Sequence, residues 1–95
     1  MDVIVLIGAN TFSSALMNAS DLKSKANATL YGNETGGNLI HFGQIKQLQI
    51  EDYYLFYSTK QFHLSNTPGP LRPDVEIMQS YSDFINGIDS VLKAL

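Results

Sequence analysis

The chain has 95 residues, of which 44% are hydrophobic and 16% charged, and its formal net charge is −3. This length and composition predict a single packed domain over residues 1–95, with a thin core. Only six basic residues are present, and they are scattered, which argues against nucleic acid as a partner; the lack of cysteine excludes disulfides and thiolate nucleophiles.

The chain opens with a strand pattern that leads into a helix pattern. Residues 3–7 are continuously apolar and mostly β-branched, which predicts a central strand buried on both faces of a parallel sheet. This run is too short to span a bilayer, and no membrane segment is expected. Apolar residues then recur at helical spacing from Phe12 to about Lys25. The side chains expected to pack on the sheet are Phe12, Leu16, Ala19 and Leu22.

A second strand is expected at residues 28–31, which would complete a βαβ unit. The glycine- and asparagine-rich stretch at residues 32–38 predicts a loop. Residues 44–50 and 53–59 predict an antiparallel hairpin. The aromatic residues expected in the core or on a sheet face are Tyr53, Tyr54, Phe56, Tyr57 and Phe62.

The C-terminal third is expected to be an irregular arm followed by two helices. The arm covers residues 66–73, and two short helices are separated by Asn86-Gly87, with Asp89 capping the second. The opening strand must be covered on both faces and flanked by neighbours, yet it begins two residues after Met1 with no lead-in. We therefore expect a C-terminal fragment of a larger protein, a homo-oligomer of at least two copies, or both.

Ser13 and Ser14 lie where the first strand meets the first helix, and two roles are open to them. A serine here can cap the helix by accepting a hydrogen bond from a first-turn N–H. It can also act as the nucleophile of acyl transfer, with a following N–H stabilising the oxyanion. The G-x-S-x-G pattern of the α/β-hydrolases is absent, so the residues alone favour capping.

Several motifs in order resemble the C-terminal part of the catalytic domain in the tail-specific (C-terminal processing) serine peptidases. The motifs are NTFSSA, ANATLYGNETGG, GQ, STKQF and RPDVEI, and the resemblance covers residues 3–95. It implies a partial ClpP/crotonase-like α/β fold, a peptide or protein substrate, no cofactor, and an extracytoplasmic location. The remainder of the peptidase would lie on a missing N-terminal part.

The resemblance also implies roles for individual residues. Ser13 matches the nucleophile, and Ser14 would contribute an oxyanion-hole N–H. The family's lysine base falls on Asn38, which cannot take a proton. Gln44 could match a supporting glutamine if the loop is two residues longer here.

Other residues of the loop and its surroundings have weaker assignments. Gly36 and Gly37 could form a tight turn with positive φ or allow a bound peptide to approach the backbone. His41 could be a local base or an exposed or hydrogen-bonded loop histidine, and His63 is the second histidine open to the role of base. Two histidines without further spaced ligands predict no metal site.

Two acidic residues complete the candidates, and the overall function stays open between classes. Glu34 could orient a substrate or simply be solvated, and Asp74 is expected to make a structural turn contact. The alternatives to a peptidase are a non-catalytic binding module that keeps the fold and its groove, and a structural fragment without activity.

Overall fold

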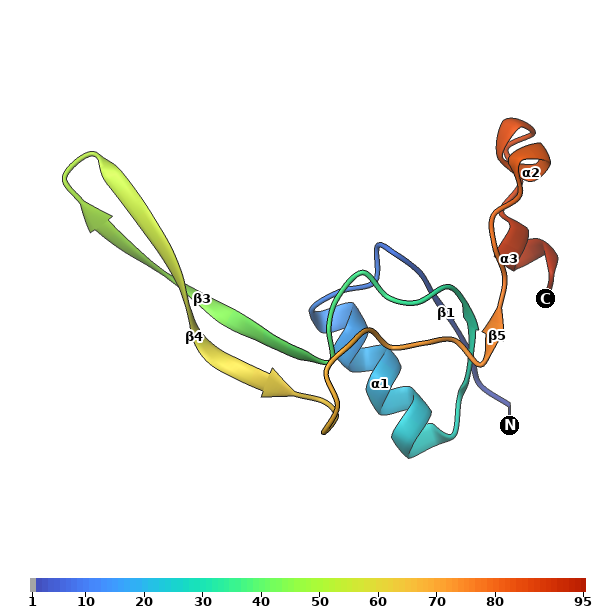
Figure 1. Ribbon diagram of the computed structural model, residues 1–95, viewed down its shortest axis with the longest axis horizontal. Helices are drawn as coiled ribbons and strands as arrows, with labels where there is room; N and C mark the ends of the chain where they lie inside the picture. Colours follow the sequence, from blue (N-terminus) through green and yellow to red (C-terminus); the bar gives the residue numbers. More distant parts are fainter. Residues whose placement is uncertain (1) are drawn as a thin grey trace.

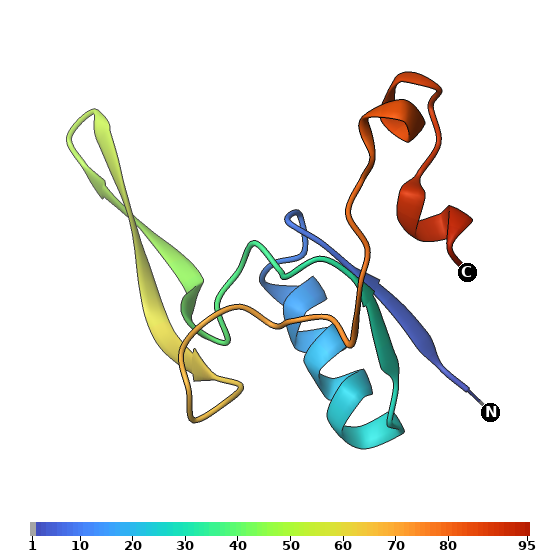
Figure 2. The same ribbon diagram turned by 45° about the vertical axis from the view of Figure 1, so that its right-hand side comes forward.

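The computed structural model describes residues 2–95 and shows a mixed α/β chain with two extensions (Figure 1). A small body holds a sheet and one long helix, a hairpin projects from one side of it, and two short helices project from the other (Figures 1 and 2). The elements in chain order are β1 (Ile4–Ile7), α1 (Ser14–Ala26), β2 (Thr29–Gly32), β3 (Ile40–Ile50), β4 (Tyr53–His63), β5 (Val75–Glu76), α2 (Tyr81–Ile85) and α3 (Ser90–Lys93).

The predicted βαβ unit is present at the centre of the body. β1 and β2 pair in parallel, starting with Ile4 opposite Thr29, and α1 connects them. β5 pairs in parallel with the other side of β2, so the strand order is β1–β2–β5. α1 ends where Asn27 adopts a left-handed conformation (φ 53°), which asparagine tolerates well, and the Ala28 N–H donates to the Leu22 carbonyl at 3.1 Å.

The hydrophobic core lies between α1 and the sheet, and it is small. Leu16 of α1 and Leu30 of β2 are its largest fully buried side chains. Leu71, from the arm that follows the hairpin, closes one side of it. The complete cluster is Ile7, Leu16, Ala19, Leu30 and Leu71, with Val5, Leu39 and Leu64 partly buried against it.

The opening strand differs from its prediction. β1 is an edge strand rather than a central one, because β2 is its neighbour on one side and no described strand pairs on the other. Ile7 is buried toward α1, whereas Ile4 and Leu6 are 48% and 40% exposed. Burial on both faces is therefore wrong for residues 2–95, since only one face of β1 has a helix packed on it.

The helix prediction holds for its central residues and fails at its ends. Leu16 and Ala19 are buried as expected. Phe12 precedes the helix and is 63% exposed, because the backbone turns at Ser13 and takes Phe12 out of the helical phase. Leu22 lies outside the core cluster that Leu16 and Ala19 join, and it is 39% exposed.

The hairpin is confirmed and is longer than predicted. β3 and β4 pair antiparallel from Ile40 opposite His63 to Ile50 opposite Tyr53. Glu51 holds the first position of the two-residue turn with φ 54°, as a type II′ turn requires. Its aromatic side chains lie on sheet faces as expected, but the expectation that they form a core is wrong, because an isolated two-stranded ribbon has no layer to cover them. Tyr53, Tyr54, Phe56 and Tyr57 are exposed, and Phe62 is half-buried.

The irregular arm and both C-terminal helices are also confirmed. The arm runs back from the hairpin to β5, and the Leu39 N–H donates to the Gly69 carbonyl at 2.8 Å. The Asp89 carboxylate accepts from the N–H groups of Val91 and Leu92 at 2.9 and 3.2 Å, so it caps α3 as predicted. Most apolar side chains of this C-terminal segment are exposed.

Candidate functional site

The corner between β1 and α1 is built by a tight turn that ends in a strained serine. The Thr11 N–H donates to the Gly8 carbonyl at 2.9 Å, and the Gly8 N–H donates to Thr11 Oγ1 at 3.1 Å. Two residues later, Ser13 has φ 54° and ψ −124°, a conformation that residues with a Cβ rarely adopt. Strain of this kind persists only where the surrounding structure enforces it.

Ser13 occupies the N-cap position of α1, but its hydroxyl does not cap the helix. No first-turn N–H donates to its side chain, and the residue is exposed. Ser80, which caps α2, shows the usual geometry: φ is −80°, ψ is 152°, and its hydroxyl accepts from the Asp83 N–H at 3.0 Å. The prediction that the Ser13 hydroxyl caps the helix is therefore wrong, because the positive φ turns it away from the first turn.

An open pocket of about 330 Å³ lies against this corner. It brings together five residues that the sequence singled out, namely Ser13, Gly36, Gly37, Asn38 and His41, with the apolar side chains of Phe12, Leu16 and Phe42. Ser14 and Gln44 are not among the residues that line it. In the described part of the chain the Ser14 N–H donates to no acceptor. Gln44 lies farther along β3, exposed and with a positive φ.

The glycines of the loop serve close packing between chain segments. A Cβ on Gly36 would overlap the Ala9 carbonyl oxygen, and one on Gly37 would come within 3.1 Å of the Phe12 Cβ. The Gly37 N–H donates to the Thr11 carbonyl at 3.3 Å. Neither glycine has a positive φ, so the tight-turn explanation is wrong; the loop is pressed against the serine corner instead.

Asn38 holds the loop in place through its side chain. Its Oδ1 accepts from the Ile40 N–H at 3.0 Å and from the Gly69 N–H at 2.9 Å. These bonds join the loop to the arm that follows the hairpin. An amide has no basic lone pair for proton transfer. Asn38 is therefore a structural tether between the loop and the arm.

His41 is held in place by one hydrogen bond and one ring contact. Its Nδ1 lies 2.8 Å from the Asn38 carbonyl oxygen, and its ring stacks on Phe62 with centroids 5.3 Å apart. Because a carbonyl only accepts, Nδ1 is the donor in this contact, and in the neutral ring Nε2 is then the acceptor. No hydrogen bond joins His41 to Ser13 among the described residues. His63 lies exposed at the end of β4, opposite Ile40, and is not among the residues that line this pocket.

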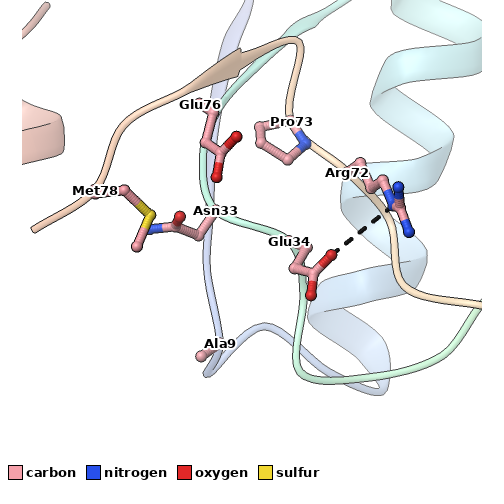
Figure 3. Close-up of a pocket in the computed structure, with 7 residues that line it drawn as sticks. All are labelled: Ala9, Asn33, Glu34, Arg72, Pro73, Glu76 and Met78. Atoms are coloured by element: carbon pink, nitrogen blue, oxygen red, sulfur yellow. Dashed lines mark ion pairs between the residues drawn. The ribbon is translucent and has the colours of Figure 1, made fainter.

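A second open pocket lies on the other side of the loop (Figure 3). Glu34 faces this pocket rather than the one beside Ser13, and its carboxylate lies 3.8 Å from the Arg72 guanidinium. Both side chains are mostly exposed, so this ion pair contributes little. The Asn33 amide donates to the Ile77 carbonyl at 3.0 Å and fixes the pocket wall. Glu34 is thus solvated and paired.

Asp74 makes the structural contact that was predicted for it. Its carboxylate accepts from the Leu30 N–H at 2.8 Å and from the Lys23 ammonium at 2.6 Å, which ties the arm to β2 and α1. The hydrogen bond from Leu30, followed by that from Lys23, holds the pKa of Asp74 below its usual value of 3.8.

No protein-family model matches the chain, and no curated protein matches it. The functional assignment therefore depends on the residues and geometry of the Ser13 pocket. Within residues 2–95, no helix is both long and apolar enough to cross a membrane. Sequence reasoning missed the strained backbone of Ser13 and the pocket contribution of Phe42, because backbone angles and pocket walls leave no periodic signal.

Proposed function

We propose that this chain is the C-terminal part of the catalytic domain of a tail-specific serine peptidase, with a ClpP/crotonase-like fold and Ser13 as its nucleophile. The ordered motifs from NTFSSA to RPDVEI support the family. The parallel βαβ unit and the serine at the strand–helix corner are compatible with it.

The observation that carries the proposal is the backbone of Ser13. A non-glycine residue in such a conformation costs about 1–3 kcal/mol. The Ser13 hydroxyl makes no capping hydrogen bond that could offset this strain energy. Glycine would adopt the same backbone angles with less strain. A strained strand-to-helix turn that exposes a serine hydroxyl is also how the α/β-hydrolases present their nucleophile. The strain at Ser13 is thus consistent with presentation of its oxygen to a substrate.

The chemistry would proceed by acyl transfer. A base removes the Ser13 proton, Oγ bonds to the scissile carbonyl carbon, and the free Ser14 N–H contributes to holding the oxyanion. The proton passes to the leaving amine as the C–N bond breaks, and water then hydrolyses the ester. Gly36 and Gly37 line the pocket, so the bound peptide would lie against their backbone. The base is His41 Nε2 or a group outside these residues.

A second candidate function is a non-catalytic peptide-binding module. The observation that favours it is Asn38, whose Oδ1 is occupied by two structural hydrogen bonds at the position where the family has a lysine. Without a base, the same pocket and serine corner would bind a peptide and leave it intact.

A fluorophosphonate probe followed by peptide mass spectrometry separates the two functions. We expect no labelling of Ser13 in the 95-residue chain, because an unassisted serine hydroxyl is a poor nucleophile. We expect labelling in a longer natural form of the protein, lost in Ser13→Ala and retained in Ser14→Ala. If the longer form also stays unlabelled, the binding module is favoured. Labelling of the short chain that disappears in His41→Ala would identify a local base.

A further inference from the structure

The β3–β4 hairpin is an apolar surface that the rest of the described chain leaves uncovered. It projects away from the body (Figures 1 and 2). Phe56 of β4 is 64% exposed, and apolar side chains lie on both faces of the ribbon. An isolated two-stranded ribbon is marginally stable in water. The exposed members are Phe42, Ile45, Leu48, Ile50, Tyr53, Tyr54, Leu55, Phe56 and Tyr57.

The surplus surface of the chain has the size of a subunit interface. Its accessible surface is 7052 Å², and its Cα radius of gyration is 16.8 Å. A compact monomer of this mass exposes about 5,400 Å² and has a radius of gyration of about 12.4 Å. The surplus of about 1,600 Å² exceeds the roughly 800 Å² that each partner buries in a standard interface.

The outer edge of β4 is the better of the two free edges for pairing. Each strand of an isolated hairpin presents unpaired backbone groups along its outer side. β3 is interrupted at Gln44, where φ is 54°, whereas β4 has no residue with positive φ. Pairing of β4 with β4 from a second copy is self-complementary, as a two-fold axis requires.

Charge selects one register for this pairing. In an antiparallel pair, alternate residues direct their backbone groups outward, so odd-numbered residues of one copy face odd, and even face even. Asp52, the turn residue that directly precedes β4, can then lie beside Lys60 of the other copy, whereas Glu51 is one residue farther from β4. Centring the pair on Phe56 places Lys60 opposite Asp52 at both ends. Lys60 and Asp52 form no ion pair within the described residues.

We propose that a second copy of this chain pairs with it along β4, antiparallel about a two-fold axis at Phe56, to form a four-stranded sheet. Tyr54 faces Ser58 of the other copy, Leu55 faces Tyr57, and Asp52 faces Lys60. The pairing joins residues 53–59 of the two β4 edges and brings the aromatic side chains of the two ribbons together on shared faces.

Cysteine cross-linking tests the register, because the chain has no native cysteine. Residues at the two-fold axis would lie with Cα atoms about 4.5–5.5 Å apart, within disulfide range. Phe56→Cys is therefore expected to form a disulfide-linked dimer under mild oxidation. The matched control is Tyr53→Cys, whose two cysteines would lie about 20 Å apart and stay reduced. Efficient cross-linking of Tyr53→Cys, or none of Phe56→Cys, overturns the register.

Charge reversal tests the ion pairs independently of cysteine chemistry. Lys60→Glu and Asp52→Lys are each expected to weaken dimerisation about tenfold, because each places like charges together at two sites. The double variant is expected to return to within about threefold of the parent. Sedimentation over a dilution series measures the constants, and circular dichroism verifies folding. A parent chain that stays monomeric at all concentrations overturns the proposal, as expected if another part of a longer protein covers the hairpin.

Discussion

Ser13 and Ser80 both occupy the N-cap position of a helix, yet their backbone conformations direct their hydroxyls differently. Ser80 is extended and accepts a first-turn N–H, whereas Ser13 has a positive φ and accepts none. Capping by serine contributes about 1 kcal/mol. The start of α1 lacks that stabilisation, and the backbone strain at Ser13 lowers its stability further. Such an arrangement is more easily explained by an exposed hydroxyl at a pocket than by stability.

Substitutions at Ser13 measure this strain directly. We expect Ser13→Ala to change the free energy of unfolding by less than about 0.5 kcal/mol, because no cap is lost. Ser13→Gly is expected to stabilise the chain by about 1 kcal/mol, since glycine accepts the positive φ. Urea denaturation of both variants checks the values, with Ser80→Ala, which loses a real cap, as the control. A loss of more than 1 kcal/mol in Ser13→Ala would mean that the hydroxyl does cap the helix.

Asp74 gives the chain an acid-sensitive contact. Hydrogen bonds from Leu30 and then Lys23 lower its pKa in the folded state, so its contribution is fully present above the unfolded value near 3.8. The contribution is lost as pH falls through the lowered pKa. We expect the melting temperature of Asp74→Asn to fall less steeply than that of the parent between about pH 4 and pH 2. Glu76→Gln, at an exposed position in β5, is the control and should follow the parent.

At the scale of elements, α1 depends on one deeply buried side chain. Leu16 is fully buried between α1 and the sheet. Leu16→Asp would bury an unpaired carboxylate and is expected to cost several kcal/mol, comparable to the whole stability of a small domain. Thermal melting tests this, with the exposed neighbour in Ala15→Asp expected to stay within about 0.5 kcal/mol of the parent. A Leu16→Asp variant that melts like the parent would contradict the packing of α1.

The two C-terminal helices are held together by a buried hydroxyl. Ser90 Oγ donates to the Asp83 carboxylate at 2.7 Å and accepts from the Ser80 N–H at 3.0 Å. Ser90→Ala would leave that N–H and the carboxylate short of a partner. We expect trypsin to cleave after Lys93 and chymotrypsin after Phe84 faster in this variant, with cleavage in α1 unchanged. Equal cleavage of parent and variant in the C-terminal segment would show that the hydroxyl is dispensable.

The secondary structure was predictable because its signals are local. The turn at residues 51–52, the cap at Asp89 and the periodicity around Leu16 each depend on neighbours in sequence. Burial was not predictable, because it depends on which segments cover a face. The exposure of β1 and of the hairpin aromatics illustrates this difference.

The candidate site was predictable in part for a similar reason. The ordered motifs singled out Ser13, Gly36, Gly37 and Asn38, and His41 was named as a local base; all of them line one pocket. The strain at Ser13 and the hydrogen bond from the arm to Asn38 depend on segments that are distant in sequence and meet only in the folded chain, so no local sequence pattern predicts them.

On the scale of the whole molecule, the chain combines a packed body with a ribbon that has little to pack on. The core residues all belong to the body, and the hairpin faces are exposed. Regions with few buried contacts open locally at much lower free energy than the core does. The two parts should therefore differ in stability, and only the ribbon should depend on a partner.

Hydrogen exchange as a function of protein concentration tests this difference. In dilute solution we expect the amides of residues 53–60 to exchange at least tenfold faster than those of residues 29–32, which lie between two strands. Raising the concentration should slow exchange in residues 53–60, because β4 gains a partner strand, and leave residues 29–32 unchanged. Peptide-resolved mass spectrometry measures both segments in one sample, so the body serves as the internal reference. Hairpin amides that are protected equally at every concentration would show that the ribbon is stable alone and needs no second copy.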